Sequence, residues 1–285
     1  MKLFRYGTPD GVRPGLVDTH GGLRDLSGHL ADITIEQLTD ERLASIASLV
    51  AMDLPLVEGK ICYAPPVGGT GKFIAIGLNY RDHSEEANLP IPSEPLLFFK
   101  ATTCISGADD PIIQPPHSSQ LDWELELAVV IGKRAQYVQE DQALDHVAGY
   151  CVANDVSDRG FQFQSSQWDK GKSSDTFGPL GPWLVTREEV PDPQNLSMWL
   201  DVNGQRRQEG NTRTMVFSVA QIVSYCSRYM TLEPGDVIIT GTPPGVSMGM
   251  KPTPKWLQPG DVVTLSIEGM GVQHHTVVPH AGAPA

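Results

Sequence analysis

The sequence predicts an α+β fold built mainly of strands. Short apolar segments rich in β-branched residues recur after residue 70, separated by turn residues as expected of strands: FIAIGLNY, LELAVVIG, HVAGYCVAND, VIITGTP and VVTLSIEG. One amphipathic helix is clear at residues 216–229, where apolar side chains share a face, namely Val219, Ile222, Val223, Cys226 and Tyr229. Because strands and helices do not alternate regularly, the pattern favours α+β over repeated βαβ units.

The chain is predicted to have a small N-terminal domain, residues 1–70, and a larger domain, residues 71–285. Residues 1–38 alternate short apolar pieces with glycine turns, which indicates small strands. Thr39 is expected to cap a short helix, because acidic residues follow it in the first turn. A Pro/Gly-rich stretch at residues 64–71 indicates a linker and places the boundary near residue 70.

Composition and charge exclude several functional classes. At 285 residues and 40% hydrophobic content, the chain can bury a sizeable core. Its formal net charge of −13 argues against nucleic-acid binding, which needs a basic patch. The sequence shows no secretory signal, no apolar run near the roughly 18 residues of a membrane span, and no clustered cysteines. We therefore expect a cytoplasmic protein that binds neither nucleic acid nor membrane.

Two carboxylates stand near the start of the segment DWELELAVVIG. Side chains two apart on a strand share a face, so Glu124 and Glu126 point the same way. Two adjacent carboxylates at the end of a buried strand repel each other unless a cation lies between them. The alternative is that both glutamates are solvated on an exposed strand end, and the pair alone does not decide.

A third carboxylate favours the cation site. Asp155 ends the apolar segment HVAGYCVAND, and the polar segment after it is compatible with a helix. Arg159 and Gln162 follow at four and seven residues, a spacing that places all three on one helical face. Three oxygen ligands indicate Mg²⁺, with Mn²⁺ or Ca²⁺ as substitutes, rather than zinc. The alternative role for Asp155 is a helix N-cap.

The segment NYRDHSEE carries a candidate base. In a helical turn, His83 and Glu86 meet on one surface, and a carboxylate beside an imidazole orients it and raises its basicity. This arrangement suits the activation of a water molecule. The alternative is a surface ion pair.

Two further segments carry groups that suit an anionic ligand. The polar loop KGKSSDTFGP contains Lys170 and Lys172, either of which could contact an anion or remain a solvated charge. The segment ITGTPPG ends a strand in a tight turn, whose backbone N–H groups and hydroxyls, including Thr242, could hold a carboxylate. An ordinary turn is the alternative.

In order and combination these motifs resemble the fumarylacetoacetate hydrolase family. The resemblance covers roughly residues 70–275 and rests on NYRDHSEE, DWELELAVVIG, NDVSDR, the lysine loop and ITGTP. It implies a mixed β-sheet rolled into a barrel-like catalytic domain behind a small N-terminal domain, and a homodimer. It implies these site residues: Glu124, Glu126 and Asp155 as metal ligands, His83 and Glu86 as the water-activating pair, Lys172 as an electrophilic partner, and Arg159, Gln162 and Thr242 lining the substrate site.

The activity implied by the resemblance is metal-dependent hydrolysis of a carbon–carbon bond in a small anionic 2,4-diketo acid. The run KSSDTFGPLGPW resembles the branch with 2,4-diketo-3-deoxy sugar-acid hydrolases, so a diketo-deoxy-L-rhamnonate or -fuconate is the leading substrate, giving pyruvate and a short acid. Ureidoglycolate lyases and diene-dioate isomerases carry similar runs. A lyase, isomerase or oxaloacetate decarboxylase on the same platform is therefore the alternative.

Overall fold

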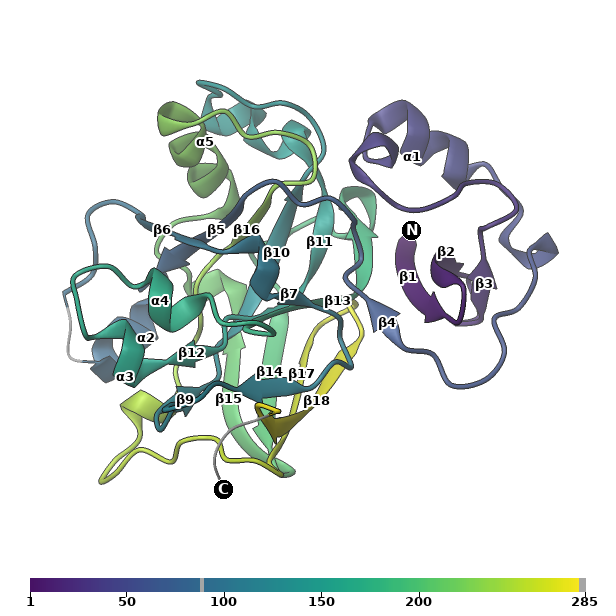
Figure 1. Ribbon diagram of the computed structural model, residues 1–285. Coiled ribbons are helices and arrows are strands. Elements are labelled where there is room, and N and C mark those ends of the chain that lie inside the picture. The colour runs from purple at the N-terminus through teal and green to yellow at the C-terminus, as the bar shows by residue number, and fades with distance from the viewer. Residues whose placement is uncertain (88–89, 282–285) are drawn as a thin grey trace.

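The computed structural model describes residues 1–87 and 90–281, without the side chains of residues 83, 84 and 87 (Figure 1). Within these ranges the larger sheet follows an open path: β3 (Leu23–Asp25), β2 (Gly11–Val17), β1 (Lys2–Thr8), β13 (Gly178–Thr186), β11 (Val147–Asn154), β10 (Leu125–Ile131), β16 (Val237–Ile239), β5 (Phe73–Gly77) and β6 (Leu96–Lys100). Two short strands join it off this path: β4 (Tyr63–Ala64) on β1 and β7 (Ile105–Ser106) on β13.

A second sheet contains five strands, in the order β15 (Gln205–Asn211), β14 (Ser197–Val202), β17 (Val262–Ile267), β18 (Val272–Pro279) and β8 (Ile112–Gln114). A small pair joins β9 (Leu121–Asp122) and β12 (Ser157–Asp158). The α-helices are α1 (Asp40–Ala47), α2 (Arg81–Ala87), α3 (Arg159–Gln162), α4 (Asp169–Lys172) and α5 (Val219–Tyr229).

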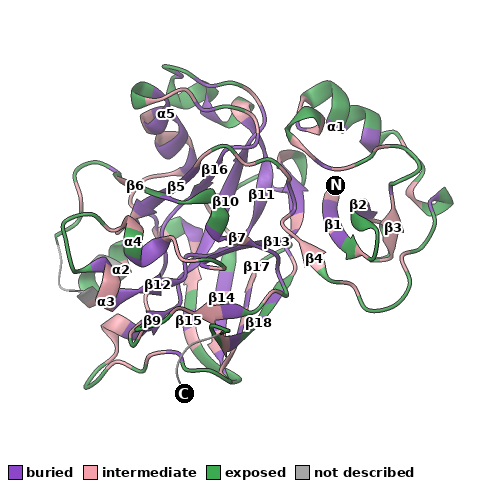
Figure 2. Ribbon diagram, in the orientation of Figure 1, coloured by how far each residue is buried: buried purple, intermediate pink, exposed green. Residues whose placement is uncertain are grey.

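The strands β10 and β11 form the centre of the core. Every residue of both strands is buried, as Figure 2 shows along the middle of the larger sheet. Burial on both faces explains why these segments read as continuous apolar runs rather than alternating ones. Their antiparallel register sets Leu125 opposite Asn154, so the start of β10 lies beside the end of β11. This register brings together the acidic residues that flank the two strands.

The structure confirms the strand-rich fold with few helices. Pairing is mixed, because β16 runs parallel to β5 and β18 parallel to β8 while most neighbours are antiparallel. The amphipathic helix α5 begins at Val219 rather than residue 216, because Ser218 caps it and forms a capping box with Gln221. Thr39 caps α1 as predicted.

The expected barrel is not closed in the described ranges. The strands β14, β17 and β18 pair with one another instead of with the edge strands β3 and β6, so two open sheets result. Neighbouring strands in a sheet must share a continuous hydrogen-bond ladder, and no such ladder joins the two edges here.

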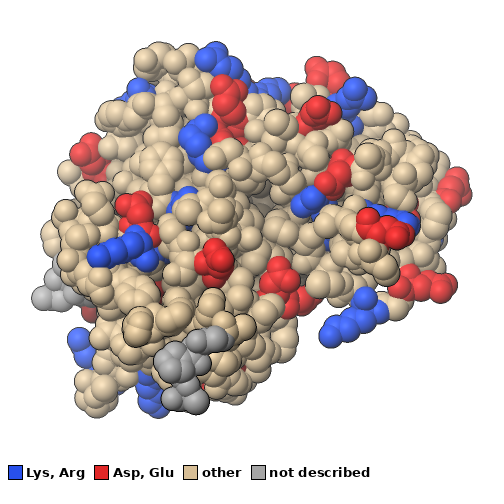
Figure 3. Space-filling view, viewed as in Figure 1, with Lys and Arg blue, Asp and Glu red and all other residues tan. Residues whose placement is uncertain are grey.

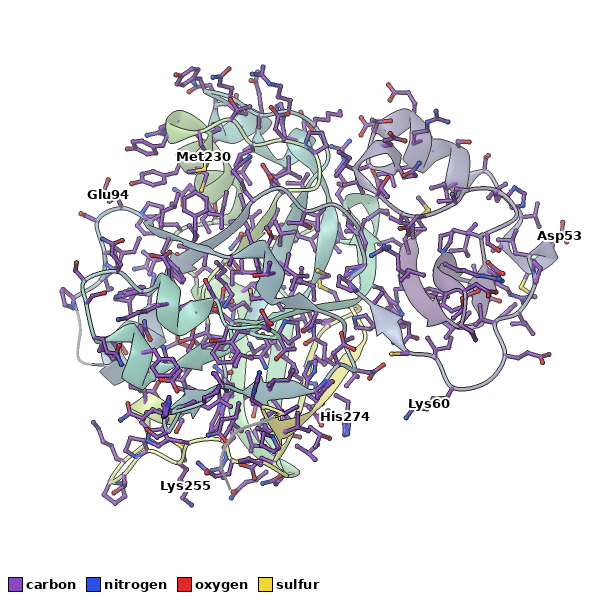
Figure 4. All side chains as sticks on the ribbon, viewed as in Figure 1. Asp53, Lys60, Glu94, Met230, Lys255 and His274 are labelled. Carbon is purple, nitrogen blue, oxygen red and sulfur yellow. The ribbon has the colours of Figure 1, made fainter. Side chains whose placement is uncertain are left out.

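The segment of residues 1–70 forms a lobe on one side of the larger body (Figure 1). The labelled Asp53 and Lys60 lie on this lobe, well away from Met230 and Lys255 on the larger body (Figure 4). Yet β1 pairs with β13, and the Met1 ammonium donates to Thr186 Oγ1 at 2.8 Å. The lobe is therefore hydrogen-bonded into the main sheet, and its status as a separate domain stays a prediction.

Acidic and basic side chains are interspersed on the molecular face in Figure 3, with no broad basic area on that face. Among the described residues, no helix is long and apolar enough to cross a bilayer.

Candidate active site

A pocket opens where the start of β10, the end of β11 and the end of β16 come together. Its empty space is about 550 Å³, a figure that includes space open to solvent. The helices α3 and α4 lie together beside this end of the sheet (Figure 1). The pocket brings together seven of the nine predicted site residues: Glu124, Glu126, Asp155, Arg159, Gln162, Lys172 and Thr242.

The three predicted metal ligands form one cluster. Glu124, Glu126 and Asp155 each offer a carboxylate oxygen, and these atoms lie within 4.8 Å of one another. The three residues are 7%, 2% and 1% exposed, so the alternative of glutamates solvated on an open strand end does not hold. The backbone joins the two segments as well, because Asp155 N–H donates to Glu124 O at 2.8 Å.

Two buried cations that line the pocket contact the cluster. Lys172 Nζ donates to Glu124 Oε2 at 2.7 Å and to Asp155 Oδ2 at 2.6 Å. The Arg159 guanidinium donates to Glu124 Oε1, and its Nε donates to Asp122 Oδ2 at 2.9 Å. Between the two candidate lysines of the loop, Lys172 is therefore the one inside the site, whereas Lys170 is exposed.

The helical face predicted for Asp155, Arg159 and Gln162 is wrong in part. The helix α3 contains only Arg159–Gln162, and its N-cap is Asp158, which accepts from Phe161 N–H. Asp155 precedes the short strand β12 and lies outside the helix. All three residues still line the same pocket, and Arg159 Nη1 donates to Gln162 Oε1 at 3.0 Å.

The surroundings of Glu124 and Glu126 shift the pKa values of the two carboxyl groups in opposite directions. Burial raises the pKa of Glu124, but Arg159 and Lys172 outweigh this effect and hold the pKa well below its ordinary value. Burial, together with the charges of Asp155 and Glu124, raises the pKa of Glu126 well above its ordinary value. Glu126 is thus the acid whose negative charge is least compensated by the protein itself.

The donor set fits a hard divalent cation. All three side chains offer oxygen atoms, and a cation beside Glu126 would relieve the repulsion among them. The Lys172 ammonium already contacts two of the carboxylates, so cation binding and Lys172 draw on the same negative charge. Mg²⁺, Mn²⁺ and Ca²⁺ all accept such ligands, and the residues do not choose among them.

Sequence reasoning missed Lys100. Its side chain is fully buried, and Nζ donates to Asp155 Oδ1 and to the backbone oxygen of Lys172, each at 2.5 Å. Lys100 therefore fixes one oxygen of a predicted metal ligand and the backbone of the predicted catalytic lysine. The signal was a lysine at the end of the apolar segment LLFFK, because a buried lysine needs an acidic partner.

The turn after β16 holds a carboxylate of the protein. Gly241 N–H donates to Glu126 Oε2 at 2.6 Å. Gly241 has a φ of 95°, and a Cβ there would lie 2.8 Å from Asn79 Cβ, so only glycine fits. Thr242 lines the pocket, but its hydroxyl donates to Leu125 O and accepts from Gln208 Nε2. Both hydrogen bonds of the Thr242 hydroxyl are therefore made within the protein and stabilise the turn.

The predicted base pair lies on α2. Both carboxylate oxygens of Glu86 accept from Gly245 N–H at 3.2 Å, and a Cβ at Gly249 would lie 2.8 Å from Glu86 Cδ. Glu86 is therefore anchored against the turn that carries Met248 into the pocket. The side chain of His83 lies outside the described residues, and the pairing of the two stays a prediction.

The ends of β10, β11 and β16 thus bring three buried acids and the buried cations that hold them to one pocket, an arrangement typical of an enzyme active site. Residues 72–278 match the family described as "Fumarylacetoacetate (FAA) hydrolase C-terminal". This chain belongs to the fumarylacetoacetate hydrolase family, as its motifs predicted.

Relatives with known sequences or structures extend over nearly the whole chain. A protein of Burkholderia multivorans, named only as a candidate hydrolase, is 56% identical over 274 residues, which cover 96% of this chain and 97% of that protein. The fumarylacetoacetate hydrolase of Exiguobacterium antarcticum is 36% identical, with a TM-score of 0.85 over 98% of this chain and 100% of its own.

Two other solved structures have names that differ in chemistry. The maleylpyruvate hydrolase of Sphingobium sp. SYK-6, in complex with manganese(II) and pyruvate, is 30% identical with a TM-score of 0.82, covering 99% of this chain and 100% of that one. A protein of Mycobacterium abscessus, named a probable 2-hydroxyhepta-2,4-diene-1,7-dioate isomerase, is 33% identical with a TM-score of 0.83 and the same coverage. Solved structures similar to this chain therefore carry both hydrolase and isomerase names.

Replacing Glu126 tests the cation site. We expect Glu126→Ala to weaken Mg²⁺ binding at least about tenfold, since removing even an outer partner of a metal ligand costs that much. Isothermal calorimetry measures the change, and Glu140→Ala, at an exposed acid outside the pocket, is the matched control. Wild-type Mg²⁺ affinity in Glu126→Ala would contradict the assignment.

Proposed function

We propose that this protein hydrolyses the C3–C4 bond of a 2,4-diketo acid of the acylpyruvate type, giving pyruvate and a carboxylic acid. The observation that carries the proposal is the buried cluster of Glu124, Glu126 and Asp155 in contact with Lys172 inside a single pocket. Cleavage to an enolate places negative charge on the pyruvyl fragment. A bound cation and a charged lysine beside it would stabilise that charge.

The cluster has a place for a resident cation. Mg²⁺ bound by Glu124, Glu126 and Asp155 would supply Lewis-acid polarisation of the substrate's carboxylate and 2-keto oxygen. The name of the Sphingobium relative, a hydrolase with manganese(II) and pyruvate, supports this assignment.

Lys172 stabilises the negative charge that develops at the pyruvyl oxygen. Burial lowers its pKa, but Asp155 and Glu124 outweigh burial and hold the pKa above its ordinary value, so the ammonium keeps its proton. A preorganised ammonium stabilises a developing negative charge without reorganising. Gln162 also lines the pocket and would orient the substrate: its side-chain oxygen accepts from Arg159, which leaves its amide N–H groups available as donors.

Water activation falls to the pair on α2. His83, oriented by Glu86, removes a proton from water, and the hydroxide attacks the C4 carbonyl carbon. The C3–C4 bond then breaks, its electron pair moves onto the pyruvyl fragment, and C3 takes up a proton to give pyruvate. The acyl fragment leaves as the carboxylic acid. Glu86 supports this assignment by its anchorage to the turn that also lines the pocket.

Several finer points belong to the proposal. The run KSSDTFGPLGPW makes 2,4-diketo-3-deoxy sugar acids one candidate class within it. We also propose a homodimer, as the family resemblance implies, and a cytoplasmic protein without nucleic-acid or membrane partners, as charge and composition predict. The second candidate function is an isomerase or decarboxylase that needs no hydrolytic water, favoured by the name of the Mycobacterium abscessus relative. The presence of both His83 and Glu86 supports hydrolysis over it.

A substrate panel tests the proposal. The purified protein with Mg²⁺, Mn²⁺ or Ca²⁺ is assayed on acetylpyruvate, a diketo-deoxy sugar acid, oxaloacetate and ureidoglycolate, with Glu126→Ala as the inactive control. Metal-dependent release of pyruvate from a 2,4-diketo acid is the expected result. Turnover of oxaloacetate or ureidoglycolate alone would replace the hydrolase by a decarboxylase or lyase.

A further inference from the structure

We propose that the acyl half of the substrate is an uncharged apolar chain or ring, and neither a polyhydroxylated chain nor a second carboxylate. This inference rests on the proposed function and narrows its substrate class. Among the described residues, the polar side chains of the pocket hold one end of the ligand, and the other lining residues are apolar or glycine.

The polarity of the pocket changes with depth. The deep end carries the carboxylates and their two cations, all at most 7% exposed. Toward solvent the lining consists of Leu78, Phe98, Trp168 and Met248, which are partly exposed, and Phe163, which is 58% exposed. A ligand whose carboxylate and keto group bind at the deep end must therefore pass its acyl group between apolar side chains.

The aromatic wall is built into the fold. The rings of Phe98 and Trp168 meet edge to face, with centroids 5.3 Å apart and an interplanar angle of 70°. Trp168 lies so close to β5 that a Cβ at Gly77 would stand 2.7 Å from its Cζ3. Leu78 has a φ of 52°, a left-handed conformation that non-glycine residues rarely adopt, and its side chain lines the pocket. Such strain is typical of ligand sites.

In the part of the lining that the structure describes, every basic side chain is already paired with an acid. Among the described residues, Arg159 and Lys172 are the basic side chains that line the pocket. Arg159 is paired with Asp122 and Glu124, and Lys172 with Glu124 and Asp155.

A polar acyl group would therefore lose hydration without replacement. Hydroxyls placed against Phe163, Trp168 and Met248 would find no donor or acceptor on those side chains, and a buried polar group without a partner is unfavourable. A methylene group buried in the same place is removed from water, which strengthens binding about fourfold.

A chain-length series tests the inference. We expect kcat/KM to rise about fourfold per added methylene from acetylpyruvate to hexanoylpyruvate. Adipoylpyruvate, in which a carboxylate replaces the terminal methyl group, and a diketo-deoxy sugar acid should both fall at least about tenfold below hexanoylpyruvate. Equal or faster turnover of either polar substrate would overturn the inference while leaving the proposed function intact.

Binding measurements separate the two proposals. If no 2,4-diketo acid is cleaved, acetylpyruvate included, the proposed function fails. Calorimetric affinities of the same compounds then decide the inference by themselves: affinity that rises with apolar chain length supports it, and affinity that is flat or higher for adipoylpyruvate overturns it.

A variant locates the effect. Phe163→Ala should reduce kcat/KM for hexanoylpyruvate more than for acetylpyruvate, because the longer chain reaches the pocket mouth. Tyr137→Ala is the matched control: Tyr137 is 68% exposed and lies outside the pocket, so neither substrate should respond. An identical loss for both substrates in Phe163→Ala would contradict an apolar subsite at this residue.

Discussion

Lys172→Met is expected to lower kcat by about 10²–10³-fold while KM changes little, because the ammonium acts on charge that develops only in the transition state. The same variant should bind Mg²⁺ at least as tightly as the wild type. Lys172 Nζ now contacts Glu124 and Asp155, and its removal leaves both carboxylates less neutralised. Loss of catalysis together with preserved cation affinity is the signature of this arrangement.

Steady-state kinetics and calorimetry on the same preparation check both halves of this prediction. Lys170→Met is the matched control, since Lys170 lies two residues away and is exposed, and it should behave as the wild type. An effect of Lys172→Met confined to KM would assign Lys172 to substrate binding. Weakened Mg²⁺ binding would instead mean that Lys172 positions the metal ligands.

The metal ligands illustrate what the sequence could predict. Glu124 and Glu126 share a face because of the two-residue period of a strand, a rule that holds regardless of tertiary structure. The approach of Asp155 depended on strand pairing, which the sequence alone does not specify. The register between β10 and β11 supplies it; the acid at the end of the second strand and the family resemblance predicted a third ligand, but not the pairing that brings it close.

Lys100 and Asp122 show why other site residues were missed. Lys100 has no recognisable spacing relationship to Asp155, and the partners of Asp122 lie far along the chain. Asp122 accepts from Arg159 and from the backbone N–H of Ser247, which lies 125 residues further along the chain. Lys100 reaches Asp155 across 55 residues. Contacts between residues so far apart in the sequence depend on how whole strands and helices pack, and local periodicity does not predict them.

Neither the two open sheets nor the apolar outer part of the pocket was predicted from the sequence. Strand patterns predicted β17 but not which strands it would join; the family resemblance implied a barrel, and two open sheets resulted. Phe163 and Trp168 stand outside the motifs that carried the resemblance. The apolar end of the pocket therefore had to be read from the structure.

His83→Ala is expected to lower hydrolysis of a 2,4-diketo acid by about 10²–10⁴-fold, the usual contribution of a positioned general base. Affinity for Mg²⁺ and for oxalate, which resembles the enolate of pyruvate, should stay at the wild-type level, since His83 is not assigned as a ligand. Hydrolysis rates and calorimetric oxalate affinities of one preparation give both values.

Glu86→Gln separates orientation from proton transfer. The imidazole remains, while the carboxylate that orients it becomes a neutral amide, so hydrolysis should fall in the same direction but less far than in His83→Ala. The side-chain amide oxygen of this variant can still accept from Gly245 N–H, which keeps α2 anchored to the turn at the pocket. Loss of oxalate binding in His83→Ala would place His83 in the binding site. Wild-type hydrolysis in that variant would make His83 and Glu86 a surface ion pair, and the base would have to be sought elsewhere in the pocket.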